Sequence, residues 1–392
     1  MAALATGPVI LVSDGWLGNT GDAASYQATT ASLRRAMPGA RVAVAAHHRE
    51  LVGDRYPDLD LVPPLDVVAG VSWPWTTAAD VEERNVVERV LDEADLVLAA
   101  GGGYLLERYG PEPRIRIYEE VLERGKRLMF YAQSIGRFRE AELRGRLVAV
   151  LEAAALILVR DEPSLAIVDE YRGAENVHLT ADEAFLFPSV RRLARPRTLL
   201  ATVSLHPWDR REGENELDDE SHLPEIAAAL TRLLESEAVR TVTLASTAQG
   251  LGGPAALEDD AVAARAVYQR IPANWRNRVV LTSGYLTPRE YAELAAHHTA
   301  LVTMRMHGAI LAATAGVPVL MLNASDKARA LSARTGGGIK AIEAREDLAR
   351  MDELVLPILT DPGATLIGQN AALEQMRNLA RKNAMLVAGA LA

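Results

Sequence analysis

The chain has 392 residues, of which 49% are hydrophobic and 24% charged, and its formal net charge is −10 at pH 7. This composition is typical of a globular protein and excludes disordered and fibrous classes, and the length predicts two domains of roughly 150–200 residues. The acidic balance argues against a nucleic-acid partner, because such binding requires a basic surface. The absence of cysteine excludes disulfides, thiolate nucleophiles and cysteine metal ligands.

The first residues, MAALATGPVILVSDGW, lack a basic region, and their apolar run stops at Ser13. This pattern indicates a first strand rather than a signal peptide. No apolar run approaches the roughly 20 residues that span a bilayer, so we expect a cytoplasmic protein without a transmembrane segment. No HExxH motif, Walker loop or carboxylate pair at metal spacing occurs, so we expect neither a metal nor a cofactor. The sequence leaves open whether the chain forms a homo-oligomer.

Strands and helices alternate along the first half, which is typical of a doubly wound α/β sheet. Loops that follow three of the strands carry candidate binding residues: Asn19 and Asp22, then Gly101 to Gly103, then Gln133 to Gly136. Glycines at such positions let a ligand approach the backbone, although the first loop does not fit a dinucleotide fingerprint. The expected strands are 8–12, 41–46, 95–100, 127–132, 156–159 and 177–180, and the expected helices are 23–37, 79–94, 113–125 and 139–155.

Other polar residues of the first half allow two interpretations each. Arg160 follows the strand 156–159, where it either contacts a ligand or pairs with one of the acidic residues that begin the next helix. Asp182 is either a turn residue or a residue of the binding crevice. Segment 57–77, with Trp73 and Trp75, is expected to be an irregular surface lobe whose tryptophans cover a flank rather than stack on a sugar.

The polar, proline-containing stretch 191–197 is the best linker candidate and separates two α/β patterns. We therefore expect domains at 1–190 and 198–365, followed by a helix at 366–392 that packs back. The second half has expected strands at 198–205, 241–245, 279–282, 300–304 and 317–322, and expected helices at 223–237, 257–271, 288–298 and 308–315.

Arg305 and His307 stand out at the carboxyl end of the strand 300–304, just before the helix 308–315. In a parallel sheet, ligands bind beyond the carboxyl ends of the strands, where the next helix also offers free backbone N–H groups. A lone His is often a satisfied core residue, but Arg is rarely buried without a partner. Between residues 261 and 325 the acidic residues are Glu290 and Glu293, on a preceding helix. An external anion, gripped through two hydrogen bonds, is therefore the expected partner of Arg305.

Several motifs together resemble the polysaccharide pyruvyl transferase family, over about residues 9 to 330. The sharpest is Arg305-Met306-His307-Gly308, and the order and spacing of all the motifs carry the resemblance. The others are Gly18-Asn19-Thr20-Gly21-Asp22, Asp95 with Gly101 to Gly103, Tyr131 to Gly136, Arg160 with Ser164, Thr180-Ala181-Asp182, Ala312, Gly316-Val317-Pro318 and Lys327.

The resemblance implies a two-domain fold similar to that of glycosyltransferase-B enzymes, with two Rossmann-like domains facing a cleft. It also implies transfer of a pyruvyl group from phosphoenolpyruvate to a saccharide or glycoconjugate acceptor as a cyclic ketal. In that family the Arg-x-His motif serves donor binding and catalysis, which assigns Arg305 to a donor anion and His307 to general acid catalysis. Further donor contacts are expected from Gly308, Lys327 and His206 of the second domain and from Arg160 of the first, and acceptor contacts from Asn19, Asp22, Gly102, Gly103 and Gln133 of the first.

Two other functions remain open at this point. The first is a nucleotide-sugar glycosyltransferase of the same architecture. The resemblance implies that such an enzyme would carry a carboxylate on the helix equivalent to 308–315 to bind ribose hydroxyls, and here that helix has none. A non-catalytic sugar-binding relative is the second, and the retained Arg305, His307 and Lys327 argue against it. His206 is either a second acid–base residue or structural, and the charged loop 209–220 has no counterpart in the family pattern.

Overall fold

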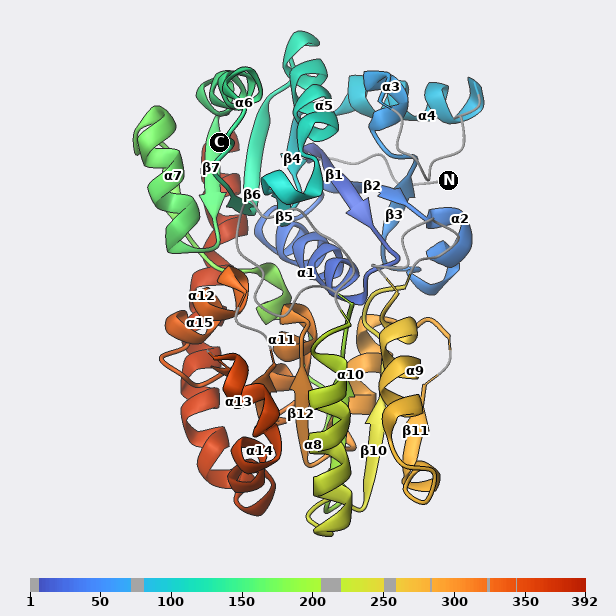
Figure 1. Cartoon of the computed structure of the whole chain (residues 1–392). Coiled ribbons are helices and arrows are strands. Elements are labelled where there is room, and N and C mark those ends of the chain that lie inside the picture. Colours follow the sequence, from blue (N-terminus) through green and yellow to red (C-terminus); the bar gives the residue numbers. More distant parts are fainter. Residues whose placement is uncertain are drawn as a thin grey trace.

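Two parallel sheets, each flanked by helices, form the upper and lower halves of the molecule in Figure 1. The computed structural model describes residues 7–71, 81–205, 220–249, 259–282, 284–322, 325–342 and 344–392. His206, Trp73 to Trp75 and residues 209–219 of the charged loop therefore lie outside the described residues.

The first sheet has, within the described residues, eight strands in the order β3-β2-β1-β4-β6-β7-β8, with β5 paired to β6. Alternating residues of β1 enter two different cores: Leu11 packs on one face of the sheet, and Ile10 and Val12 pack on the other. A strand buried on both faces is typical of a parallel sheet between helical layers. The strands are β1 (Val9–Trp16), β2 (Arg41–His47), β3 (Asp60–Val62), β4 (Leu96–Ala99), β5 (Gly102–Leu105), β6 (Leu128–Ile135), β7 (Leu156–Val159) and β8 (Val177–Leu179).

Helices cover both faces of this sheet, and side-chain caps define where two of them begin. The Asn19 side chain accepts hydrogen bonds from the N–H groups of Gly21 and Asp22, so α1 begins at the domain interface. Asp161 caps α7 in the same way through Ser164. The helices are α1 (Thr20–Ala36), α2 (Arg49–Val52), α3 (Asp66–Ala69), α4 (Val81–Glu93), α5 (Glu112–Glu123), α6 (Ala141–Ala153) and α7 (Glu162–Arg172), with 3₁₀ turns η1 (Gly53–Arg55), η2 (Glu107–Tyr109) and η3 (Glu183–Leu186).

The second sheet repeats this plan with strand order β11-β10-β9-β12-β13-β14, all parallel. Adjacent residues of β9 again alternate between two cores, Leu199 in one and Leu200 in the other. Its strands are β9 (Thr198–Thr202), β10 (Thr241–Leu244), β11 (Val279–Leu281), β12 (Ala300–Thr303), β13 (Val319–Met321) and β14 (Lys340–Ala341). Its helices are α8 (Leu223–Glu235), α9 (Asp260–Arg270), the turn η5 (Arg276–Arg278), α10 (Pro288–Ala296), α11 (Met306–Thr314), α12 (Asp326–Arg334), α13 (Arg345–Ala349) and α14 (Met351–Thr360).

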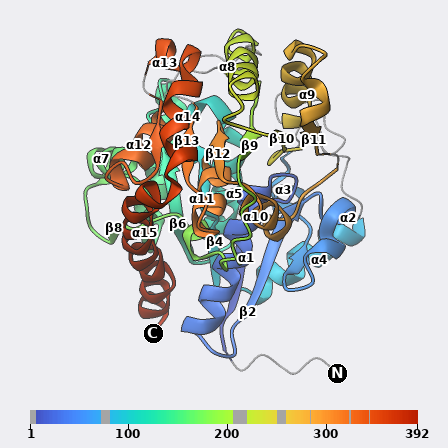
Figure 2. The same cartoon turned by 90° about the horizontal axis from the view of Figure 1, so that it is seen from below.

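The last helix, α15 (Pro362–Leu391), runs along both halves of the molecule (Figures 1 and 2). Near its start, Gln369 is buried and hydrogen-bonds the backbone of Val317 and Val319 in the second half. Near its end, Asn383 is buried and donates to the carbonyl of Ala181 and to Glu183 in the first half. One helix thus ties both halves together. Among the helices that the structure describes, none combines the length and hydropathy needed to cross a bilayer.

Two stretches that the sequence predicts as loops are strands. Because β4 ends at Ala99 and pairs with β6 only as far as Phe130, the second half of β6 needs another partner. Gly102 to Leu105 supply it as β5, with Gly102 opposite Gln133. The predicted loop starting at Gln133 is accordingly the end of β6, which is buried along its whole length.

Candidate functional site

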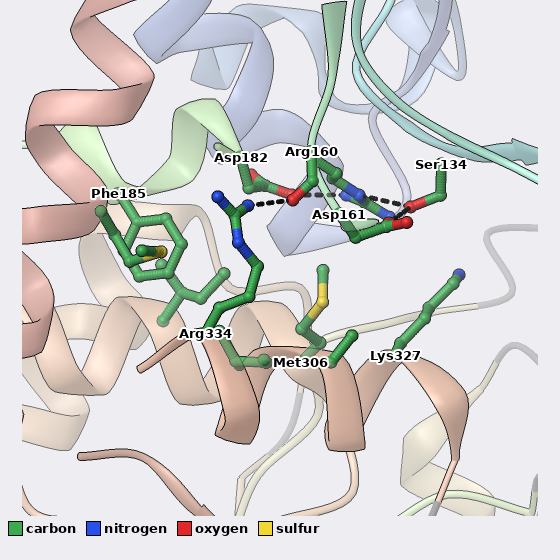
Figure 3. A pocket seen from close by; sticks show the side chains of 12 residues that line it. Ser134, Arg160, Asp161, Asp182, Phe185, Met306, Lys327 and Arg334 are labelled. Carbon is green, nitrogen blue, oxygen red and sulfur yellow. Dashed lines mark hydrogen bonds and ion pairs between the residues drawn. The ribbon is translucent and has the colours of Figure 1, made fainter. Parts of the chain in front are cut away.

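The carboxyl ends of β6 and β7 carry a buried polar cluster centred on Arg160 (Figure 3). Its Nε donates to Ser134 Oγ at 2.8 Å, and its Nη1 donates to Asp182. Ser134 donates in turn to Asp161 at 2.6 Å, and Asp161 accepts from the Ser164 N–H at 2.9 Å. Of the two interpretations of Arg160, the structure thus gives it an acidic partner, although that partner is Asp182 rather than a residue of the following helix.

Two cations from α12 approach Arg160 from the second half (Figure 3). Arg334 donates through Nη1 to the carbonyl oxygen of Arg160, and its Nε lies 3.2 Å from a Glu162 carboxylate oxygen. Lys327 donates to the Tyr109 hydroxyl at 3.2 Å and lies 4.7 Å from the centroid of that ring. Burial lowers the pKa of Arg334, although Glu162 and Asp161 oppose this; an Arg remains charged at physiological pH.

These three cations line one partly open pocket. One wall is charged and the other apolar. A small anion with a short hydrocarbon part matches such a lining, since the cations neutralise it and the apolar wall excludes water. The lining residues are Ser134, Arg160, Asp161, Asp182, Lys327 and Arg334 on the polar side, and Phe185, Met306, Ile310, Ala330, Leu331 and Met376 on the apolar side.

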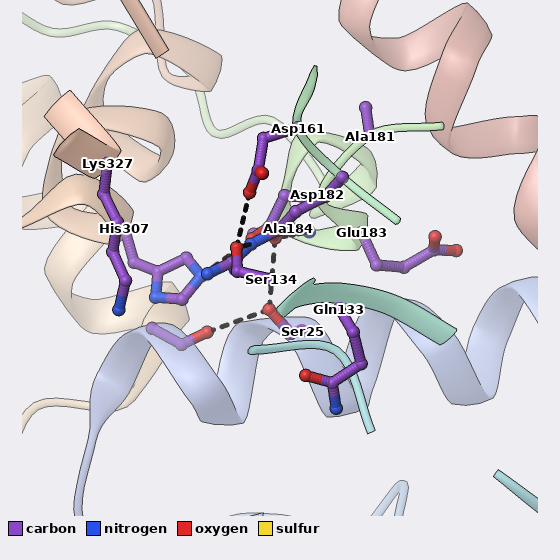
Figure 4. Close-up of polar contacts among 12 residues, drawn as sticks. Ser25, Gln133, Ser134, Asp161, Ala181, Asp182, Glu183, Ala184, His307 and Lys327 are labelled. Atoms are coloured by element: carbon purple, nitrogen blue, oxygen red, sulfur yellow. Dashed lines mark hydrogen bonds and ion pairs between the residues drawn. The ribbon is translucent and has the colours of Figure 1, made fainter. Parts of the chain in front are cut away.

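His307 lies beside this pocket, in the first turn of α11, and points into the first half of the molecule (Figure 4). Its Nε2 lies 3.2 Å from Asp182 Oδ2, and its Nδ1 lies 3.9 Å from Asp22 Oδ1. The side chain is only 13% exposed. Gly21 of α1 makes room for the ring, because a Cβ at that position would lie 2.2 Å from the His307 Cβ.

Asp182 is held by donors from four directions. Its Oδ2 accepts from Arg160 and His307, and its Oδ1 accepts from the Ala184 N–H at 2.9 Å and from Ser25 Oγ at 3.3 Å. Burial alone would raise the Asp182 pKa, but the charges of His307 and Arg160, with the hydrogen bonds from His307 and Ala184, lower it far below its usual value. The ionised form of Asp182, which accepts hydrogen bonds at both oxygens, is therefore favoured.

The pKa of Asp22, on the opposite side of the imidazole, is shifted in the opposite direction. Its burial at the interface raises its pKa, and this effect outweighs the opposing charge of His307, a hydrogen bond from Tyr104 and the charge of Lys327. The His307 ring thus lies between one carboxylate whose pKa is lowered, Asp182, and one whose pKa is raised, Asp22. Carboxyl groups with separated pKa values beside one imidazole are typical of acid–base sites.

Arg305 has a different partner from the one its sequence predicts. Its Nε and Nη2 both donate to Asp260 Oδ1, at 2.9 and 2.7 Å, so an internal carboxylate takes the place of the expected external anion. Asp260 begins α9 and is fully buried, and its other oxygen accepts from the N–H groups of Thr247 and Ala248. The sequence did not indicate Asp260 as a partner, because residue 260 reaches the end of β12 only through the sheet order, in which β10 and β12 both flank β9.

The residues expected to contact an acceptor are only partly brought together. Asp22 faces His307, and Asn19 caps α1 through its side chain. Gln133 does not face the interface, since it is buried within β6 and donates through Nε2 to the Ala100 carbonyl. Its assignment to acceptor binding is corrected by this position.

The two glycines of β5, Gly102 and Gly103, have different surroundings. A Cβ at Gly103 would lie 2.4 Å from Lys327 Nζ, which places Gly103 against the cation pocket rather than apart from it. A Cβ at Gly102 would lie 2.5 Å from the Tyr104 ring, so that ring covers Gly102. Gly308, expected on the donor side, packs instead against the Tyr291 hydroxyl, which would be 2.9 Å from an added Cβ.

Sequence reasoning missed Arg334 and left Asp182 undecided. Arg334 ends α12, where a cation is ordinarily explained by the helix dipole, so its position gave no signal. Asp182 carried a weak signal, because it follows β8 at the same sheet edge as Arg160. Among the described residues, no group of three or more His, Asp or Glu side chains is arranged to hold a metal ion.

The arrangement of two Rossmann-like halves with a site between them defines a glycosyltransferase-B-like fold. The structure is similar to a putative UDP-N-acetylglucosamine 2-epimerase from Listeria monocytogenes, with a TM-score of 0.57 and 14% identity over 97% of this chain and 94% of that one. For the UDP-GlcNAc 2-epimerase from Neisseria meningitidis bound to UDP-GlcNAc, the TM-score is 0.58 and the identity 11%, over 95% of this chain and 97% of that one. For a glycosyltransferase from Rickettsia africae ESF-5, the TM-score is 0.55 and the identity 10%, over 97% of this chain and 96% of that one. These likenesses confirm the predicted fold class.

A sequence model of one family, polysaccharide pyruvyl transferase, matches residues 19–326. The match contains His307, Asp182 and Asp22, and of the three pocket cations it contains Arg160. The chain therefore belongs to the polysaccharide pyruvyl transferase family, as its motifs predicted. A search of curated protein sequences finds no significant match.

Proposed function

We propose that the protein transfers the pyruvyl group of phosphoenolpyruvate to two hydroxyl groups of a saccharide or glycoconjugate, forming a cyclic ketal and releasing phosphate. The observation that carries this proposal is the placement of His307, between two carboxylates and beside a pocket with three cations. Membership of the family makes a pyruvyltransferase the natural enzyme class.

The donor has two anionic groups on a small unsaturated carbon skeleton, and the pocket offers matching features. Lys327 and Arg334 come from one domain half and Arg160 from the other, so phosphate and carboxylate can each contact a cation. The first turn of α11 adds backbone N–H groups near Met306. The apolar side of the pocket suits the methylene group.

Ketal formation requires a proton at the methylene carbon and the loss of two hydroxyl protons. Protonation of that carbon makes the neighbouring carbon electrophilic, and the two acceptor oxygens bond to it while its bond to the phosphate oxygen breaks. One hydroxyl proton balances the new C–H bond, and the other leaves with phosphate. His307 supplies the proton, because an imidazole exchanges protons in either direction near neutral pH.

Donor binding can be tested before the acceptor is known, by titration calorimetry with phosphoenolpyruvate, UDP and UDP-sugars. We expect binding of phosphoenolpyruvate and a loss of tenfold or more in affinity for Lys327→Ala, since charge-assisted hydrogen bonds contribute about 1.5–3 kcal/mol. Arg329→Ala is the matched control, because Arg329 lies on the same helix but pairs with Asp326 on its exposed side. Binding of UDP or a UDP-sugar alone would replace this proposal with a nucleotide-sugar glycosyltransferase.

Turnover is then measured by release of inorganic phosphate from phosphoenolpyruvate in the presence of a panel of saccharides, followed by ³¹P NMR. Phosphate release that depends on both the saccharide and His307 supports pyruvyl transfer. Donor binding without turnover of any saccharide would instead favour a non-catalytic relative.

A further inference from the structure

The two ring nitrogens of His307 face different carboxylates, and this asymmetry assigns them different roles. Building on the proposed function, we infer that Asp182 is a positioning residue that holds the Nε2–H group, and that His307 exchanges its proton through Nδ1. We further assign Asp22 as the base that receives the first acceptor proton and returns it to Nδ1. The acceptor therefore binds on the Asp22 side of the ring.

Asp182 has the contacts of a fixed anchor. At 3.2 Å, its Oδ2 is within hydrogen-bond reach of Nε2, and it also accepts from Arg160. Its other oxygen is occupied by Ser25 and by the backbone of Ala184. Each oxygen is bound by two donors and 7% of the side chain is exposed, so the carboxylate is committed to these contacts and is not expected to take up a proton. An acceptor of this kind keeps the imidazole hydrogen on Nε2 and fixes the orientation of the ring.

The opposite side of the ring is arranged differently. The distance of 3.9 Å between Nδ1 and Asp22 Oδ1 is too long for a direct hydrogen bond. One oxygen atom can nevertheless lie about 2.8 Å from both atoms, which is an ordinary hydrogen-bond distance. A sugar hydroxyl in that place would touch the base and the imidazole at once. Because residue 21 is a glycine, no side chain fills this space; a Cβ there would lie 2.4 Å from Nδ1.

The proton balance closes with these two groups alone. The Nδ1–H bond of the imidazolium breaks as a C–H bond forms at the donor methylene, and the first acceptor hydroxyl bonds to the neighbouring carbon while its proton passes to Asp22. The second acceptor hydroxyl then takes the place between Asp22 and Nδ1, and Asp22 returns this proton to Nδ1 through it. The second hydroxyl bonds to the same carbon as the C–O bond to phosphate breaks, and its proton leaves with phosphate. No oxidant, reductant or outside proton is required.

Proton NMR of the ¹⁵N-labelled full chain tests the anchor without any substrate. We expect a downfield imidazole proton bonded to Nε2, identified as His307 by its loss in His307→Gln. It should disappear in Asp182→Asn and persist in Asp22→Asn. A downfield proton on Nδ1, its absence from the wild type, or its persistence in Asp182→Asn would overturn the assignment. Should Asp182→Asn not fold, the nitrogen that carries the proton in the wild type decides alone.

Kinetics test the role of Asp22. Asp22→Asn should lower kcat by about 10²–10⁴-fold, the usual contribution of a general base, with KM for phosphoenolpyruvate changed less than threefold. Asp169→Asn, an exposed aspartate on α7, is the matched control and should leave both constants unchanged. An unchanged kcat in Asp22→Asn overturns its role. If the wild type shows no turnover of phosphoenolpyruvate, the proposed function fails, whereas the NMR result still decides the arrangement around His307.

Discussion

Gly21 and His307 meet across the interface so closely that a Cβ atom at residue 21 would lie 2.4 Å from the imidazole Nδ1. Gly21 lies in the first turn of α1 and His307 in the first turn of α11, so two helix N-termini converge on one ring. The glycine is required here by close approach rather than by its backbone angles. The orientation of the ring therefore depends on the absence of a side chain in the other half of the molecule.

Gly21→Ala should displace His307 from Asp182 and lower kcat by on the order of 100-fold, since a shift of about 1 Å in a reacting group has effects of that size. The measurement is steady-state turnover of the donor with circular dichroism as a check of folding. Gly145→Ala is the control, because Gly145 lies on α6 with no atom within 4 Å of an added Cβ. The control should keep full activity and gain up to about 1 kcal/mol in stability. Wild-type kcat in Gly21→Ala would show that the ring does not need its observed place.

Arg305→Ala should act mainly on stability. It removes two hydrogen bonds from Asp260, whose carboxylate is fully buried, and breaking a buried ion pair costs about 3–5 kcal/mol. Arg305→Lys should recover only part of this, because Lys lacks the guanidinium whose Nε and Nη2 both donate to Asp260 Oδ1. Urea unfolding of both variants gives the free energies, and calorimetry gives donor affinity. A stable Arg305→Ala variant that has lost donor binding would restore the direct donor role expected from the sequence.

Glu183→Gln should change how stability depends on pH. Burial raises the Glu183 pKa from 4.5 to about 7, so between these values the folded chain holds a proton that the unfolded chain releases. Stability is thus lost as pH rises through this window, by about 3 kcal/mol at 1.36 kcal/mol per pKa unit. The variant should lack this loss, so its free energy of unfolding should fall less between pH 5 and pH 8 than that of the wild type. Urea unfolding at both pH values measures it, with exposed Glu175→Gln as control; parallel curves for Glu183→Gln and the wild type would refute it.

Asn383→Ala should weaken the site from a distance. The Asn383 amide donates at 2.9 Å to the Ala181 carbonyl and at 2.7 Å to Glu183, the two residues that flank Asp182. Leaving these buried acceptors without a donor costs about 1–3 kcal/mol and loosens the anchor of His307. We expect a lower melting temperature and a several-fold lower kcat. Lys382→Ala, on the exposed side of the same turn, should change neither; equal melting temperatures for the two variants would contradict the prediction.

Much of the fold could be predicted because apolar runs and strand-end glycines mark parallel strands locally. The strand before Arg305 and the placement of His307 at its carboxyl end follow from that pattern. What failed were pairings that depend on the third dimension. Gln133 looked like a loop residue because its strand continues beyond the apolar run into polar residues, and only the pairing with β5 buries it.

The site itself was predicted in part, for the same reason. His307 and Lys327 begin the helices that follow two successive strands, β12 and β13, so their placement at one sheet edge could be inferred from the sequence. The approach of Asp182 and Asp22 to His307 joins residues from opposite halves of the chain, and no local pattern encodes it. Arg334 was hidden by an ordinary helix end.

The helix that carries Asn383 also sets an order of events during synthesis. Asn383 supports the Ala181 carbonyl from 202 residues further along the chain. At about 5–20 residues per second, a ribosome needs roughly 10–40 s to make the intervening segment. The first half can collapse during that interval, but the turn that bears Asp182 lacks the hydrogen bonds from Asn383 until α15 has been made. The surroundings of Asp182 are consequently completed last, after both sheets have been made.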